Sequence, residues 1–289
     1  MRKERFKINE ELSVSQVVED MTEDLVSQLN LRLKDSGFFI SKDKSVLFKK
    51  GTINFNCEKH LKNIKVLDVI YAVYYLKSKE EWIFYNQNGF LTCSADYENK
   101  NIKVNLAYVN NKPSDDFSSS IRHELKHIYE YDCGMKKNES FYNKVYNRYK
   151  NGDKWEQTIA WALYLSFKTE QDAFLSQYYE YLKIHNPYNA KIINDYNNPY
   201  YQFDVAFDRV DRLNFTEEQL KQSFGLTINQ LYHILKSADE RLFKKMTHVY
   251  QKFINDEKEK NKIMEMRRMN FLFECYDKGI STEESDFIW

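Results

Sequence analysis

Apolar and polar positions change their spacing along the chain, and each spacing predicts a different element. Apolar residues recur every three or four positions over 13–34, which predicts an amphipathic helix. A similar pattern over 63–77 predicts a second helix. Short apolar runs at 82–85 and 90–93 indicate two strands, and the clean alternation over 102–109 indicates a third. A small sheet is therefore expected after the first two helices.

A further helix is expected directly after the last strand. Ser118 to Ser120 can cap its start, and Gly134 can end it. From there on the apolar spacing is mostly helical, and it predicts helices over 138–150, 155–183, 216–224, 227–255 and 258–276. The segment 186–200 is rich in Asn, Pro and Tyr and is the best place for a boundary. The sequence thus predicts an α+β fold with a predominantly helical C-terminal part, divided into 1–198 and 199–289.

Charge and composition narrow the function classes. The 289 residues include 43 basic and 43 acidic side chains, so no net charge attracts nucleic acid or an anionic membrane. The N-terminus is charged and lacks the apolar run of a signal peptide, and no stretch of about 18 apolar residues could span a bilayer. The four cysteines form no C-x-x-C pair. These observations predict a cytoplasmic protein with no nucleic-acid and no membrane partner.

The candidate chemistry lies in the helix after the third strand, where the sequence reads H-E-L-K-H. His123 and His127 are four residues apart, so a helix places both imidazoles on one face, where they can bind one zinc ion. Glu124 lies about 100° around the helix from His123 and can reach a water molecule at the metal. The sequence therefore predicts a zinc site with Glu124 as general base.

Such a zinc site needs a third protein ligand and one open position for water. The extended pattern H-E-x-x-H-x-x-G-x-x-H is not continued, because its glycine is missing and its last position holds Cys133. Acidic residues on a later helix are the other candidates, namely Glu156, Glu170 and Asp172. Thr169 and Asp172 fit a capping box, which gives Asp172 a structural role and leaves Glu170 free.

The motif H-E-L-K-H, followed by E-Q-D-A at 170–173, resembles the gluzincin branch of the zincin metallopeptidases over roughly residues 100–183. The resemblance implies a zincin-like core that hydrolyses peptide bonds in a peptide or protein substrate. It also implies that the strand at 102–109 is the edge strand along which an extended substrate lies. Carried over residue by residue, it implies three zinc ligands and a general base, which are His123, His127, Glu170 and Glu124.

The sequence does not decide which group stabilises the oxyanion of such a reaction. A second electrophile should fill this role beside the metal. The candidates are Tyr131, Tyr178, Tyr179 and His185.

Two other classes of protein compete with the peptidase. The helix at 227–255 carries an apolar seam for a partner helix, which suits a homo-oligomer or an assembly component. Such a component, for example a virion-associated phage protein, would keep the zincin fold with a structural or vestigial metal site. In a DNA-linked regulator, residues 216–236 would form a helix-turn-helix. DNA binding would need Lys and Arg around the second helix, and residues 226–235 contain neither.

Overall fold

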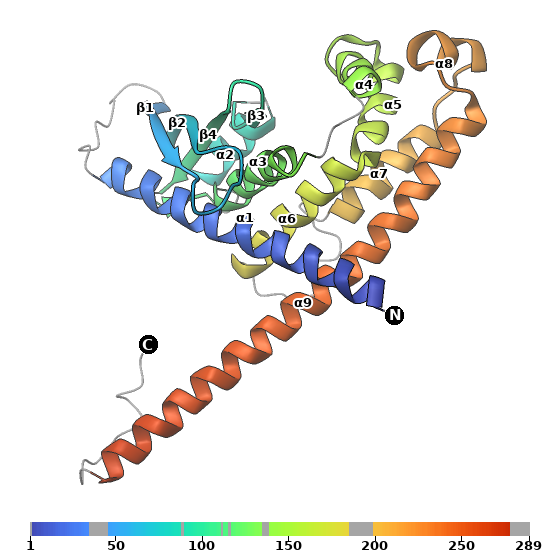
Figure 1. The fold of residues 1–289 in the computed structure, drawn as a ribbon. Helices are drawn as coiled ribbons and strands as arrows, with labels where there is room; N and C mark the ends of the chain where they lie inside the picture. The colour runs from blue at the N-terminus through green and yellow to red at the C-terminus, as the bar shows by residue number, and fades with distance from the viewer. Residues whose placement is uncertain are drawn as a thin grey trace. The chain divides into compact units, whose positions relative to one another are not determined.

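Helix α1 follows the apolar spacing predicted for it, and in the computed structural model it spans Arg2–Lys34 (Figure 1). The structure describes residues 2–34, 46–87, 90–110, 112–114, 117–134, 139–184 and 199–277. The chain divides into two compact units, residues 1–243 and 244–289. The first unit contains the sheet and the predicted metal-site residues, so the boundary expected near residue 198 falls inside this unit.

The described residues form a five-stranded sheet in the order β1-β2-β4-β3, with β5 paired to β4. Its strands are β1 (Val46–Asn56), β2 (Val66–Leu76), β3 (Cys93–Asp96), β4 (Asn101–Val109) and β5 (Lys112–Pro113). β2 and β4 run parallel, and the other pairs are antiparallel. β4 matches the strand predicted at 102–109, but it is not the edge strand that the zincin resemblance implied. The turn after β3 folds that strand back onto β4, so β3 occupies the edge.

The helix predicted over 63–77 is wrong, because this segment forms β2. Buried and less buried positions alternate along most of β2, as in a strand with one face on the core. The apolar residues of the segment can be read with either spacing. Most of them are β-branched or aromatic, including Val69, Ile70, Tyr71 and Val73, and such side chains favour a strand over a helix.

The strand predicted over 82–85 is also wrong, because these residues lie in α2 (Lys79–Gln87). The hydroxyl of Ser78 accepts a hydrogen bond from the Glu81 amide at 3.3 Å, and the Glu81 carboxylate accepts one from the Lys77 amide at 2.7 Å. This arrangement is close to a capping box, which starts a helix. The strand predicted over 90–93 begins only at Cys93, where pairing with β4 starts.

One face of the sheet is covered by α1 and by α3 (Phe117–Asp132), the helix that carries H-E-L-K-H (Figure 1). Alternate residues of β1, β2 and β4 pack against apolar side chains of both helices. The buried residues that α1 and α3 contribute are Val18, Met21, Leu25, Leu29, Leu33, Phe117, Ile121, Leu125 and Ile128. This packing fixes α3 against the sheet. Phe117, the first residue of α3, belongs to the core, and the predicted caps Ser118–Ser120 lie in the first turn of the helix.

The remaining described elements are helices: α4 (Glu139–Asn151), α5 (Lys154–Ser166), α6 (Lys168–Ile184), α7 (Pro199–Asp211), α8 (Glu217–Phe224) and α9 (Ile228–Asp277). The helices predicted over 138–150 and 216–224 are confirmed, but 155–183 is divided at Phe167, whose backbone is extended (φ −66°, ψ 133°). The two helices expected over 227–276 form the single helix α9, since the polar run between them contains neither Gly nor Pro.

The C-terminal end of α3 is held by a buried carboxylate. Asp132, 7% exposed, accepts hydrogen bonds from the backbone amides of Lys62, Asn63 and Ile64 at 2.7 to 2.9 Å. The side chain of Asn63 donates in return to the backbone oxygen of Asp132 at 2.8 Å. Gly134 then takes a positive φ of 77° and ends the helix, as predicted. The loop between β1 and β2 is thereby attached to the helix that carries the candidate site.

Replacing Asp132 by Ala should lower the free energy of unfolding by about 3 kcal/mol, because three backbone amides lose a charged acceptor. Urea unfolding followed by circular dichroism measures this loss. The matched control is Asp208→Ala, which removes an exposed carboxylate of α7 that pairs with Arg212 just after the helix. Equal stability of the two variants would contradict the structural role given to Asp132.

Candidate metal centre

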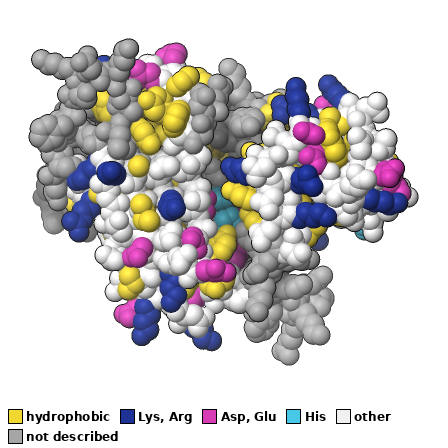
Figure 2. Space-filling model, turned by 90° about the horizontal axis from the view of Figure 1, so that it is seen from above, with side chains coloured by type: hydrophobic (Ala, Val, Ile, Leu, Met, Phe, Trp, Pro, Cys, Tyr) yellow, Lys and Arg dark blue, Asp and Glu magenta, His cyan; other side chains and the backbone are white. Residues whose placement is uncertain are grey.

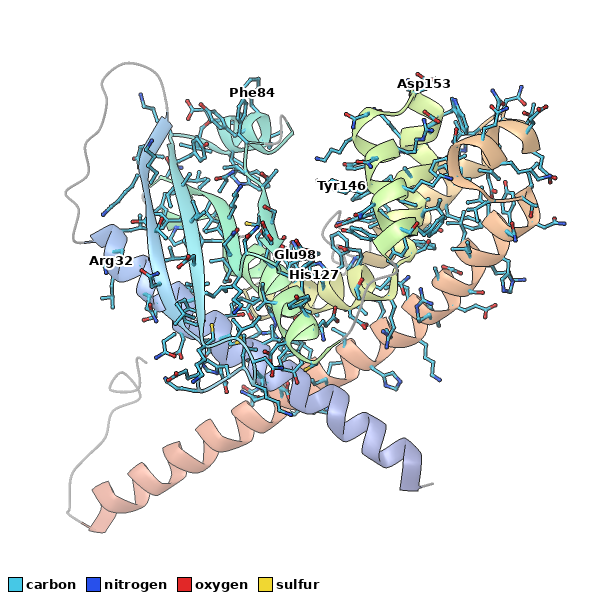
Figure 3. All side chains as sticks on the ribbon, turned by 45° about the horizontal axis from the view of Figure 1, so that its top comes forward. Arg32, Phe84, Glu98, His127, Tyr146 and Asp153 are labelled. Carbon is cyan, nitrogen blue, oxygen red and sulfur yellow. The ribbon has the colours of Figure 1, made fainter. Side chains whose placement is uncertain are left out.

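The two histidines of H-E-L-K-H lie on the face of α3 that meets α6. Ile121, Leu125 and Ile128 turn the opposite face of the helix into the core under the sheet, so the four-residue spacing of His123 and His127 directs both rings away from it. His123 is 8% exposed and His127 4% exposed. Figure 3 shows His127 on α3, beside the yellow-green ribbon of α6. The sequence motif is therefore placed at an interface between helices and not on an open surface.

The third predicted ligand reaches the same point from α6. The Nε2 atoms of His123 and His127 are 3.2 Å apart, and Oε2 of Glu170 lies 3.8 Å and 3.3 Å from them, respectively. One atom of each residue lies within 4.8 Å of the others, an arrangement that could hold a metal ion. Tetrahedral zinc with bonds of about 2.0 to 2.2 Å separates its ligands by about 3.3 to 3.6 Å. The three distances therefore fit an ion of this size.

A hydrogen bond on the far side of the His123 ring directs its Nε2 atom toward the cluster. The Nδ1 atom of His123 lies 3.1 Å from Oε1 of Gln177, an acceptor that favours a proton on Nδ1. The Nδ1 atom of His127 faces the buried carboxylate of Glu130, whose Oε2 lies 4.0 Å away. The Nε2 atoms of both rings and one carboxylate oxygen of Glu170 converge on a single point. A cation at this point satisfies all three.

Two tyrosines from the neighbouring helices reach Glu170, which is completely buried. The hydroxyl of Tyr142 on α4 donates a hydrogen bond to Oε1 of Glu170 at 3.2 Å. Tyr164 on α5 also hydrogen-bonds Glu170, and burial together with the Glu170 charge raises the pKa of Tyr164 well above its usual value. Its hydroxyl therefore keeps its proton and can act as a donor. Neither tyrosine was singled out from the sequence.

Glu124 lies next to this cluster without belonging to it. Its side chain is buried with 8% exposed, and its charge acts on the same Tyr164 that contacts Glu170. The cluster of possible ligands in the described residues consists of His123, His127 and Glu170. Figure 2 shows histidine at the bottom of a hollow on this face of the molecule. Glu124 is therefore a buried carboxylate next to His123 in the sequence and outside the ligand group.

A buried ion pair holds α6 against α3 at this position. Arg122, 1% exposed, donates from Nε to the Ser176 hydroxyl at 3.0 Å and from its terminal nitrogen to Glu180 at 2.9 Å. Glu180 also contacts Lys183, which pairs with Glu19 of α1. Arg122 precedes His123 in the sequence. The contact that aligns the two helices is therefore adjacent to the first metal ligand.

The bend between α5 and α6 comes just before Glu170, and the residues on both sides of it are held by contacts with α9. Gln171, 1% exposed, donates from Nε2 to the backbone oxygen of Ala238 on α9 at 3.1 Å. Arg241 donates to Oε1 of Gln171 and to the backbone oxygen of Ser166, both at 2.6 Å. The first turn of α6 and the last carbonyl of α5 are therefore held by the start of α9.

The capping box predicted at Thr169 and Asp172 is wrong. The helix α6 begins at Lys168, so Thr169 lies inside it and cannot be the N-cap. The extended backbone of Phe167 starts the helix earlier, and the Gln171 amide bonds to the Phe167 carbonyl oxygen at 2.9 Å. The charge of Asp172 instead acts on Glu130 and Arg241. Glu170 does lie close to the two histidines, but the capping argument that favoured it was incorrect.

The other predicted ligands have different positions. Glu156 belongs to a capping box with Asp153 at the start of α5, and it binds the Ser223 hydroxyl and Arg148. Cys133 follows the last turn of α3 and is exposed. Among the described residues, neither joins the cluster of His123, His127 and Glu170.

The candidates for the oxyanion group lie in different surroundings. Tyr178 is fully buried and stacks on Tyr181, and Tyr179 lies under the guanidinium of Arg122 at 5.0 Å. Tyr131 is 46% exposed and stacks on Tyr97. His185 lies outside the described residues.

Two residues that contact the histidines, Tyr97 and Gln177, were not identified in the sequence analysis. The ring of Tyr97, which follows β3, packs edge-on against the His127 ring at 6.2 Å. Its position depends on the pairing of β3 with β4, and no local pattern carries that information. Gln177, which binds His123, lies seven residues after Glu170, two helical turns along the same face. That spacing was the available signal for Gln177.

No protein-family model matches the chain, and no curated protein or solved structure matches it either. In the described part of the chain, no helix combines the length and apolarity needed to cross a membrane. The resemblance to zincins therefore depends on the motif and on the geometry of the cluster.

The cluster predicts about one zinc ion per chain, and His123→Ala or His127→Ala should abolish binding by removing a ligand. Glu170→Gln should weaken zinc binding far more than Glu156→Gln or Cys133→Ser. Elemental analysis after dialysis and competition with a chromophoric chelator measure these effects.

Glu156→Gln is the matched control for Glu170→Gln, because both replace a buried carboxylate on the α5–α6 segment by its neutral isostere. The control should lower the melting temperature through the lost cap while it keeps the zinc. A larger loss of zinc in Cys133→Ser than in Glu170→Gln would overturn the ligand assignment.

Proposed function

We propose that the protein is a zinc-dependent peptidase of the zincin type, with a zincin-like α+β core. The proposal is supported chiefly by the convergence of His123, His127 and Glu170, with Glu124 buried beside them. The same four residues were chosen from the sequence. The cluster brings together His123 of α3 and Glu170 of α6, which are 47 positions apart in the sequence. A chance pair of histidines on a polar helix face would not explain a buried carboxylate at this distance.

The composition of the cluster favours zinc in a catalytic site over zinc in a structural one. Two imidazoles and one carboxylate suit zinc, and three protein ligands leave a fourth position for water or substrate. Structural zinc sites are usually closed by four protein ligands, most often cysteines. Cys57 is buried and Cys133 is exposed, and among the described residues neither joins the cluster. The assembly-protein alternative with a structural metal is therefore the weaker reading.

The residues of the chain have separate roles in this reaction. His123, His127 and Glu170 would hold the zinc ion, which lowers the pKa of water toward about 7 and polarises a peptide carbonyl. Glu124 accepts a proton from the attacking water and delivers it to the leaving amine. Gln177 holds the His123 ring in the tautomer that offers Nε2.

The sheet edge nearest the centre is the proposed substrate position. β3 is the edge strand, runs antiparallel to β4 and packs against α3. An extended peptide could pair with β3 through backbone hydrogen bonds, while its side chains alternate toward and away from the site. This assigns to β3 the role that the sequence analysis had given to residues 102–109.

Replacing Glu124 by Gln should keep the zinc and the melting temperature and reduce peptide hydrolysis by about 10²- to 10⁴-fold, because an amide cannot accept the proton. Zinc content, thermal melting and cleavage of a peptide library are measured on the same preparations.

Glu98→Gln is the control, since Glu98 is exposed on the turn after β3 (Figure 3) and has no part in the proton transfer. It should cleave at the wild-type rate. Unchanged cleavage by Glu124→Gln would refute the mechanism. A wild-type protein that holds zinc and cuts no peptide would favour the assembly-protein reading.

A further inference from the structure

We propose that Tyr142 and Tyr164 are positioning residues that hold Glu170 as a ligand through one oxygen and keep the fourth zinc position open. This inference rests on the proposed zinc centre. It adds a role for the α4–α5 helical hairpin, which carries no part of H-E-L-K-H and no predicted ligand except the rejected Glu156.

The two oxygens of Glu170 face different partners. Oε2 points to the imidazoles, at 3.3 Å from Nε2 of His127 and 3.8 Å from Nε2 of His123. Oε1 accepts the hydrogen bond from the Tyr142 hydroxyl at 3.2 Å. When a carboxylate binds a metal through one oxygen, a hydrogen bond to its other oxygen fixes its orientation. The Tyr142 contact therefore selects Oε2 for the metal.

Tyr164 supports the same carboxylate from α5. Its hydroxyl hydrogen-bonds Glu170, whose side chain is completely shielded from water. A buried carboxylate is costly unless donors or a cation compensate its charge. Two tyrosine hydroxyls supply part of this compensation without adding a competing positive charge to the site.

The rings of both tyrosines are fixed by their neighbours. Tyr142 packs against Tyr164 at 5.9 Å and against Phe167 at 5.2 Å between ring centroids, and Tyr164 lies parallel to Trp161 at 5.7 Å. Phe167 is the residue at the bend between α5 and α6. The hydroxyls are therefore held on the same rigid segment that sets the position of Glu170.

The consequence concerns the coordination number. If both oxygens of Glu170 bound zinc, the second oxygen would occupy or crowd the position needed by water. Removing the Tyr142 hydroxyl takes one donor away from Oε1. The expected result is weaker binding of zinc together with a change in coordination, which a loss of packing alone does not produce.

The test compares Tyr142→Phe, Tyr164→Phe and the double variant in the full chain. Each keeps its aromatic ring and loses only the hydroxyl. The control is Tyr146→Phe, since Tyr146 of α4 stacks on Tyr142 at 6.3 Å but is 41% exposed (Figure 3). The readouts are zinc affinity by chelator competition, the melting temperature of the metal-free protein, and the visible spectrum after loading with cobalt(II).

Tyr142→Phe should weaken zinc binding by about 10- to 100-fold. Its cobalt spectrum should lose intensity as the ion gains a fifth ligand, while the metal-free melting temperature stays near that of wild type. Tyr164→Phe should act in the same direction, and Tyr142→Phe alone decides the question if Tyr164→Phe does not fold. Tyr146→Phe should match wild type.

Wild-type affinity and spectrum in Tyr142→Phe would overturn the proposal, as would an equal loss in Tyr146→Phe, which would assign the effect to ring packing. These outcomes are independent of peptidase activity. Altered zinc affinity without any peptide cleavage would leave the positioning role standing and reject the peptidase function alone.

Discussion

The buried contact between Arg122 of α3 and Glu180 of α6 is the constraint on which the candidate centre depends. Arg122 is inaccessible to water, and its guanidinium is matched by a carboxylate, a serine hydroxyl and the ring of Tyr179. Breaking a buried ion pair by removing one partner is strongly destabilising, so the two helices have one preferred alignment. In that alignment the next residue of α3, His123, faces the helix that carries Glu170.

Electrostatics within the centre then favour a cation. Oε1 of Gln177 favours a proton on Nδ1 of His123, and the Nε2 atoms of His123 and His127, 3.2 Å apart, lie 3.8 Å and 3.3 Å from Oε2 of Glu170. A carboxylate as completely buried as that of Glu170 is costly unless its charge is compensated, and a metal ion would supply this compensation. The fold thus couples the packing of α3 and α6 to the candidate metal site.

Local patterns in the sequence predict the features that local spacing controls. The positions of His123 and His127 on one helix face, the alternation of β4 and the helical C-terminal part all follow from periods of 3.6 or 2 residues. The β2 segment was predicted incorrectly as a helix because its apolar residues fit both periods. The contacts of Glu170 with Tyr142 and of α3 with Glu180 join residues far apart in the chain, and no local period encodes them.

The central claim is an open zinc centre with three protein ligands. Crystals of the zinc-loaded chain, measured on both sides of the zinc absorption edge, test this claim most directly. The account predicts one anomalous peak bonded to Nε2 of His123, Nε2 of His127 and one oxygen of Glu170, with solvent in the remaining position beside Glu124. A peak held by four protein ligands, or no peak between these residues at saturating zinc, would contradict it.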